Sequence, residues 1–300
     1  MMTPHHIAVG DTRLSVSTAG AGMPLLLLHA FPLDHAMWQR QMPLAEHLRL
    51  IVPDQRGFGG SGDSLPESIE QLAADAVALL DALHVAGPAV VCGVSMGGYV
   101  AQHVATRHPE RVAALVLVDT KLEADTPEAH AGRADLAAKV GRLGQGILAD
   151  AMIPRLLAAS SEARALPGRV EAEAILRRSI MAQPVTTIQA ALYALAARPD
   201  MTEAMRQAHL PTLLVVGAED VITPPSCLEA AEGIIPKAKL LEVPLAGHLV
   251  PLEQPDVFNR AVLEFLRELP SGQLAGMLPG LSTKASPTAE RAGLGSGRRA

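Results

Sequence analysis

A serine between two glycines is the first group in this chain that could do chemistry. Residues 93–97 read Gly-Val-Ser-Met-Gly, which places Ser95 in a G-x-S-x-G motif. An apolar run over residues 89–94 precedes it and a helical pattern over residues 95–107 follows it. This strand–turn–helix setting predicts a tight turn that presents Ser95 as a nucleophile, and a Cβ at either glycine would collide there. The alternative is an ordinary serine at a helix N-cap.

A serine hydroxyl is a weak nucleophile near neutral pH and needs a neighbouring base. Of the 11 histidines, His248 is favoured, because it follows the last apolar run and precedes the last helical pattern. It should therefore lie on a loop at the sheet edge that also carries the serine. His103 and His108, on or after the helix that follows the serine, are expected at the surface. His29 is expected to be a structural loop residue.

A carboxylate must orient the base and stabilise its cation. Asp220 closes the run Gly-Ala-Glu-Asp after the apolar residues 212–216, and it fits the chain order serine, carboxylate, histidine. Asp119 is the alternative, because it also ends an apolar run between the serine and the histidine. Glu219 precedes Asp220, but adjacent loop side chains usually diverge. We expect Asp220 to be the partner of His248.

An oxyanion formed by attack on a carbonyl needs two backbone N–H donors. The first is the N–H of Met96, directly after the nucleophile, at the start of a helix whose N-terminus favours negative charge. The second should come from the loop after the apolar run 25–28, where Phe31 is the expected donor.

The remaining pattern predicts the elements that position these residues. The apolar runs are continuous rather than alternating, which indicates strands buried on both faces of a mostly parallel sheet flanked by helices. An N-terminal hairpin over residues 5–18, turning at Gly10-Asp11, and helices starting near residues 69, 95 and 253 complete an α/β fold class. The runs lie at residues 25–28, 48–52, 89–94, 113–118, 212–216 and 239–243.

The same pattern divides the chain into three parts. Residues 1–120 and 201–269 form the α/β core, and residues 121–200, with helical patterns broken by prolines, form a helical insertion or cap. Residues 270–300 are rich in Gly, Ser and Pro and are predicted to be a disordered tail.

Composition excludes several other classes. The net charge is −6 over 300 residues, which argues against nucleic acid as the main partner. The two cysteines fit no metal or disulfide pattern, and no apolar run is long enough to span a bilayer. Without a signal peptide, a cytoplasmic protein that uses no membrane is expected. The oligomeric state stays open.

Five segments together make the chain resemble the α/β-hydrolase superfamily, and within it the branch of 3-oxoadipate enol-lactonases, small esterases and cofactor-free haloperoxidases. The resemblance implies the α/β-hydrolase fold, with residues 121–200 as the cap that shapes the substrate pocket. Ala30 stands where the family usually has glycine, so the loop that carries Phe31 is expected to differ slightly. The segments are His29-Ala30-Phe31-Pro32, residues 54–61, residues 93–98, residues 217–220 and Gly247-His248.

These residues predict a serine hydrolase that cleaves small carboxylic esters or lactones through an acyl-enzyme, with no metal and no organic cofactor. Three alternatives remain open. Perhydrolysis, suggested by Pro32, would replace water with peroxide. A carbon–carbon bond hydrolase could share the Ser-Met-Gly-Gly turn. A ligand receptor could keep the same residues and signal through its cap.

The composition of the cap indicates the polarity and charge of the acyl group that the pocket would accept. Residues 121–200 contain one aromatic, Tyr193, among many alanines and leucines, which favours aliphatic acyl groups of modest polarity. Arg133, Arg142 and Arg155 are expected on the solvated faces of cap helices. If one pointed inward, it would select an acidic substrate such as an enol-lactone carboxylate.

Overall fold

The computed structural model describes residues 4–62 and 64–269, so the predicted disordered tail, residues 270–300, lies outside the described residues. Its centre is an eight-stranded sheet of order β1-β2-β4-β3-β5-β6-β7-β8. Strands β1 and β2 pair antiparallel, as do β2 and β4, and every other neighbouring pair is parallel. The strands are β1 (Pro4–Val9), β2 (Thr12–Ala19), β3 (Pro24–Leu28), β4 (Arg49–Pro53), β5 (Ala89–Val94), β6 (Val112–Val118), β7 (Thr212–Gly217) and β8 (Ala238–Val243).

The mostly parallel sheet predicted from the continuous apolar runs is confirmed. Every residue of β3, β5, β6 and β7 is buried, as expected for strands covered on both faces. The predicted hairpin is β1–β2, which turns at Gly10 with a φ of +54°. Because aromatics make up only 2% of the chain, Leu, Val, Ala and Ile fill most of this core.

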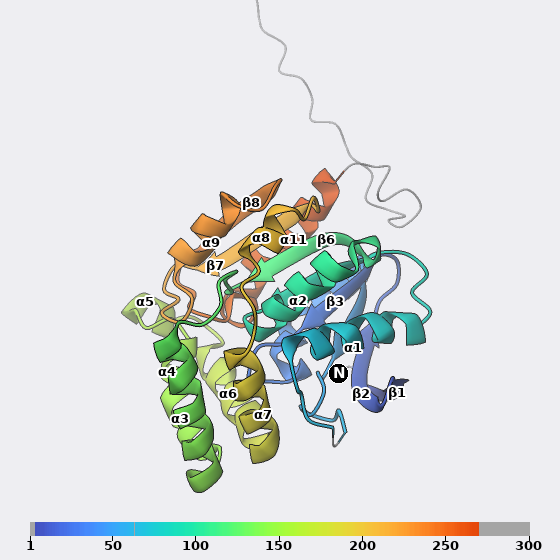
Figure 1. The fold of residues 1–300 in the computed structure, drawn as a ribbon. Helices are drawn as coiled ribbons and strands as arrows, with labels where there is room; N and C mark the ends of the chain where they lie inside the picture. The colour runs from blue at the N-terminus through green and yellow to red at the C-terminus, as the bar shows by residue number, and fades with distance from the viewer. Residues whose placement is uncertain (1–3, 63, 270–300) are drawn as a thin grey trace, which may run out of the picture.

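Helices cover both faces of the sheet. Helix α2 packs on β3, β5 and β6, and Figure 1 shows α1 and α2 in front of the sheet with α11 behind it. The helices flanking the sheet are the 3₁₀ helices η1 (His35–Glu46) and η2 (Pro109–Arg111), with α1 (Ile69–Ala82), α2 (Met96–Arg107), α8 (Thr202–Arg206), α9 (Pro225–Glu232), α10 (Val250–Glu253) and α11 (Pro255–Glu268).

The segment between β6 and β7 consists of helices and their connections. Helix α3 packs on α7 and α4 packs on α6, and Figure 1 shows these four helices gathered beyond one end of the sheet. Pro167 and Pro184 lie between helices, but Pro154 lies inside the last turn of α4 rather than breaking it. The helices are α3 (Pro127–Leu143), α4 (Gly146–Leu156), α5 (Ser161–Arg164), α6 (Arg169–Ala182) and α7 (Val185–Ala196).

Within the described residues, none of the helices combines the length and the apolar character that crossing a membrane requires. The carboxyl ends of β3, β5, β6, β7 and β8 all meet one edge of the sheet, because these strands run parallel. The loops that leave this edge carry the residues singled out above.

Candidate active site

Ser95 occupies a strained turn between β5 and α2. Its backbone has φ 52° and ψ −112°, a region that residues with a Cβ rarely adopt. Its N–H donates to the carbonyl of Val118 at 2.9 Å, and its own carbonyl accepts the Thr120 hydroxyl at 3.1 Å. The Ser95 side chain makes no capping hydrogen bond to α2, so it does not behave as an ordinary N-cap serine. Local strain of this kind is concentrated at functional sites.

The glycines of the motif are required by close backbone contacts. A Cβ at Gly93 would lie 2.0 Å from the carbonyl oxygen of Gly97, and a Cβ at Gly97 would lie 2.1 Å from that of Leu28. Both distances are far below van der Waals contact, as the sequence motif implied. The turn can therefore form only with hydrogen atoms at these two positions.

We expect Gly97→Ala to lower the free energy of unfolding by at least about 3 kcal/mol, because the clash is with backbone that cannot rotate away. The measurement is the denaturant midpoint beside Gly132→Ala as the control. Gly132 lies in α3 with nothing within 4 Å of an added Cβ, so its replacement should be neutral or slightly stabilising. Equal stability of Gly97→Ala and wild type would contradict the packing described here.

Asp220 and His248 are joined directly. His248 Nδ1 lies 2.7 Å from Asp220 Oδ2, and both side chains are nearly inaccessible to solvent. The other carboxylate oxygen accepts the N–H groups of Ile222, at 2.7 Å, and Thr223, at 3.1 Å. Burial alone would raise the pKa of Asp220, but the facing imidazole and these hydrogen bonds outweigh it and lower the pKa. A carboxylate is therefore held against one ring nitrogen of His248, leaving Nε2 free for chemistry.

The carboxylate of Asp119, the alternative partner of His248, binds backbone N–H groups instead. Its two carboxylate oxygens accept the backbone N–H groups of Gly217, at 2.9 Å, and Val250, at 3.1 Å. It is fully buried, and burial together with the nearby charge of Asp220 raises its pKa well above the ordinary value. Asp119 thus ties the end of β7 to the start of α10, and among the described residues no hydrogen bond joins it to His248.

The three other histidines considered as the base lie in different surroundings. His29 Nε2 accepts the N–H of Gln55 at 2.9 Å, and its ring packs edge-on to Phe58 with centroids 5.2 Å apart. His108 is half-buried as a whole residue but keeps 39% of its side chain exposed, in line with its expected place at the surface. The surface expectation for His103 was wrong, since it is only 2% exposed. Its position in α2, which is covered by the sheet and by α1, explains its burial.

Phe31 and Met96 lie where backbone donors are expected. Phe31 follows β3, and Met96 is the first residue of α2, beside the turn of Ser95. Within the described ranges, neither N–H donates to another group of the protein. Ala30 is not among the non-glycine residues with positive φ, so alanine is accommodated at this position without that strain.

Sequence reasoning missed Thr223 and Glu253. The Thr223 hydroxyl donates to Asp220 Oδ2 at 2.7 Å and lies 3.2 Å from His248 Nδ1. Its spacing of three residues after Asp220 was the available signal. Glu253 accepts the N–H of Gly247, the residue before His248, at 2.8 Å. Glu219 diverges from Asp220 as expected and accepts the N–H groups of Ala159 and Ser160.

An acidic cluster after β3 and β4 is the one group in the described part of the chain with metal-ligand spacing. Asp34, His35 and Asp54 bring ligand atoms within 4.8 Å of one another. Asp54 already accepts the N–H groups of His35 and Gly60, and Asp34 accepts that of Ala36. These bonds fold the two loops, and they account for the cluster without an ion.

A cavity of about 230 Å³ lies between the loops at this sheet edge and the helical insertion. The expectation that the three cap arginines face solvent was wrong for Arg133, which is half-buried and lines the cavity. Arg142 and Arg155 are exposed as expected, and Arg155 also lies at the cavity wall. The lining residues are Phe31, Ala129, Gly132, Arg133, Leu136, Met152, Arg155, Leu192 and Ile222.

Comparison with known proteins agrees with this architecture. A thermophilic esterase from Thermogutta terrifontis has a structure with a TM-score of 0.83 and 38% identity, over 88% of this chain and 98% of that one. The 3-oxoadipate enol-lactonase 2 of Acinetobacter baylyi is 28% identical over 84% of this chain and 92% of its own length. A Mycobacterium tuberculosis protein named as a non-heme bromoperoxidase is 27% identical over 84% and 97%.

A family model described as the alpha/beta hydrolase fold matches residues 23–255, which is well over half of the chain. The match contains the turn of Ser95, the loops of Asp220 and His248, and the whole helical insertion. The predicted resemblance is therefore confirmed, and the chain belongs to the alpha/beta hydrolase fold family.

Proposed function

We propose that this protein is a serine hydrolase that cleaves small carboxylic esters or lactones through an acyl-enzyme. Ser95 is the nucleophile, His248 the general base and Asp220 the group that orients the base. The observation that carries the proposal is the buried 2.7 Å hydrogen bond between Asp220 and His248, at the sheet edge that also carries the strained turn of Ser95. This arrangement has the roles and chain order of a serine hydrolase triad.

In the proposed reaction, Ser95 Oγ attacks the carbonyl carbon while His248 Nε2 takes the hydroxyl proton. The imidazolium then gives that proton to the leaving oxygen, and the acyl group stays on Ser95. Water attacks the acyl-enzyme next, with His248 again as the base. Asp220, held by the hydroxyl and N–H of Thr223, keeps the Nδ1–H directed at its carboxylate and stabilises the cation.

The negative charge of the tetrahedral intermediate is assigned to the N–H groups of Phe31 and Met96. Both are free of other acceptors among the residues described, and Met96 begins a helix whose N-terminus favours an anion. Each such donor contributes about 3–4 kcal/mol to the transition state in comparable enzymes.

The cavity supports a substrate with a small, partly apolar acyl group and an anion. Its volume of about 230 Å³ is below the usual range of ligand pockets, and Leu136, Met152 and Leu192 supply apolar lining. Arg155 also lines it and has no carboxylate within ion-pair distance in the described part of the chain. Arg133 is paired with Asp125, which also binds Arg198 at 2.7 Å. The 38% identical esterase was solved with malate, a dicarboxylate, bound.

The test is kcat/KM for neutral esters of increasing acyl length beside a lactone that bears a carboxylate. We expect hydrolysis of the whole series and a preference of about fivefold for the anionic lactone, because Arg155 is exposed and an exposed ion pair contributes at most about 1 kcal/mol. Arg155→Ala should remove most of this preference and leave neutral esters nearly unaffected, while Arg142→Ala, outside the cavity, should change neither.

Two outcomes would favour a function other than ester hydrolysis. Very low rates across the whole panel would contradict hydrolysis and favour a ligand receptor. Faster acyl transfer to peroxide than to water would favour a perhydrolase, the activity class suggested by the 27% identical bromoperoxidase. Equal rates for neutral and anionic substrates would contradict only the role of Arg155.

A further inference from the structure

Glu253, at the end of α10, makes two hydrogen bonds to backbone on either side of the cap boundary. Its Oε1 accepts the N–H of Gly247 at 2.8 Å, and its Oε2 accepts the N–H of Ala158 at 2.7 Å. The N–H of His248 donates to the carbonyl of Leu156 at 3.0 Å. The loop that carries His248 is therefore fastened to the segment that follows α4, and Glu253 supplies two of the three bonds.

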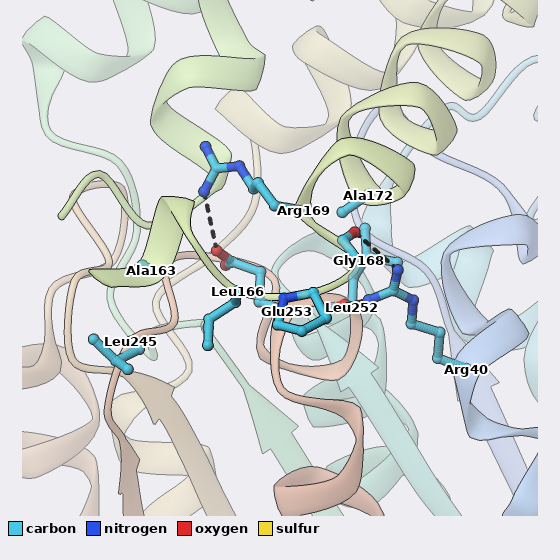
Figure 2. A pocket seen from close by; sticks show the side chains of 10 residues that line it. Arg40, Ala163, Leu166, Gly168, Arg169, Ala172, Leu245, Leu252 and Glu253 are labelled. Carbon is cyan, nitrogen blue, oxygen red and sulfur yellow. Dashed lines mark hydrogen bonds and ion pairs between the residues drawn. The ribbon is translucent and has the colours of Figure 1, made fainter. Parts of the chain in front are cut away.

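The surroundings of Glu253 leave no room for a ligand, and they set the pKa of its carboxyl group. Figure 2 shows it beside Arg169, whose guanidinium lies 3.8 Å away and donates to the Ala158 carbonyl at 2.6 Å. The adjoining cavity of about 10 Å³ can hold no more than about one water molecule. Burial raises the pKa of Glu253 to about 7, although the N–H groups of Ala158 and Gly247 and the charge of Arg169 offset part of this effect.

A carboxylate is the group that this geometry needs. Two N–H donors from different segments converge on one side chain, and a carboxylate offers two acceptor oxygens to receive them. A glutamine amide would offer one acceptor and direct an NH₂ group at the other N–H. Because burying a carboxylate is costly, the two hydrogen bonds that it accepts are expected to serve more than packing.

We propose that Glu253 is a positioning residue, which fixes the backbone at Gly247 so that the His248 imidazole and the cap segment at Ala158 are held in one arrangement. The inference rests on the proposed role of His248 as the base. Glu253 does not touch the substrate cavity, so its effect on turnover passes through the position of His248.

Protonation of Glu253 should change the dependence of turnover on pH. Protonation of Glu253 replaces one acceptor by an O–H donor, and one of its two backbone bonds is lost. The other charged groups near it are Arg169 from α6, Arg40 from η1, which donates to the Leu252 carbonyl at 2.8 Å, and Asp119 after β6, which binds the N–H of Val250. Because the protonated form keeps only one of the two bonds, kcat should fall on the acid side as the pH drops through about 7, where Glu253 takes up its proton.

The experiment compares wild type, Glu253→Gln and Glu219→Gln on one neutral ester between pH 5 and pH 9. Glu253→Gln should lower kcat about 10- to 100-fold with little change in KM, and the fall in kcat near pH 7 should be absent from it. Glu219 also accepts two N–H groups from the cap segment but none from Gly247. Glu219→Gln should therefore keep the pH profile of wild type.

The pH dependence of kcat in Arg169→Ala is a second test if Glu253→Gln folds poorly. Arg169 lowers the pKa of Glu253, so its loss should move the upper part of the acid limb to higher pH. An unchanged acid limb in Arg169→Ala, or a wild-type pH profile and kcat in Glu253→Gln, would overturn the positioning role. Failure of the triad itself would be recognised separately, as turnover that survives Ser95→Ala.

Discussion

Ser95→Ala is expected to lower kcat for a simple ester about 10⁶-fold, the loss seen when the nucleophile of a serine triad is removed. The side chain lies outside any capping hydrogen bond, so its removal should leave the turn and the free energy of unfolding nearly unchanged. A fluorophosphonate probe, which reacts with activated serines, should label the wild type and spare the variant.

The matched control for this prediction is Ser161→Ala, an exposed serine in the short helix α5. It should keep full labelling and full turnover, because no described contact links it to His248. Equal labelling of wild type and Ser95→Ala would contradict the assignment of Ser95 as the nucleophile, whatever the variant's residual activity.

Asp220→Asn should lower kcat about 10⁴-fold, because an amide at this position stabilises the wrong tautomer of the imidazole. The direct contact of Asp220 with His248 Nδ1 and the lowered pKa of this carboxylate both indicate an anion at that place. The pH dependence has a defined sign: protonation of Asp220 as the pH falls through its depressed pKa should remove this contribution.

Asp119→Asn is the control, and it is expected to reduce stability while changing kcat little. Its carboxylate binds the N–H groups of Gly217 and Val250, so one acceptor is lost and stability should fall by about 1–3 kcal/mol. Its kcat should stay within about tenfold of wild type, since no contact with the imidazole is removed. If Asp119→Asn lost the 10⁴-fold and Asp220→Asn were mild, the two assignments would have to be exchanged.

The sequence by itself determined the sheet and the turn. Continuous apolar runs mark strands buried on both faces, and the two glycines around Val94, Ser95 and Met96 are required by backbone contacts within a few residues of the motif or one strand away. These features depend on local chemistry and on strand order, so they can be recognised without coordinates. The order of the serine, carboxylate and histidine along the chain narrowed the carboxylate to two residues.

Only the tertiary structure shows which of those two carboxylates contacts His248. Asp119 and Asp220 both follow buried strands, and both belong to loops at the same sheet edge. The choice depends on side-chain direction: Asp119 turns to Gly217 and Val250, while Asp220 turns to His248. Direction is set by φ, ψ and neighbouring backbone donors, which a pattern of residue types does not contain.

The same reason explains the residues that were placed wrongly or missed. His103 was expected at the surface because it is polar and helical, but α2 is covered by both the sheet and α1, so that little of it faces solvent. Arg133 and Glu253 contact partners or a cavity formed by segments that are distant in sequence. Such contacts arise only once the cap has packed over the sheet edge, because the apolar faces of its helices, and not its charged residues, decide how it lies there.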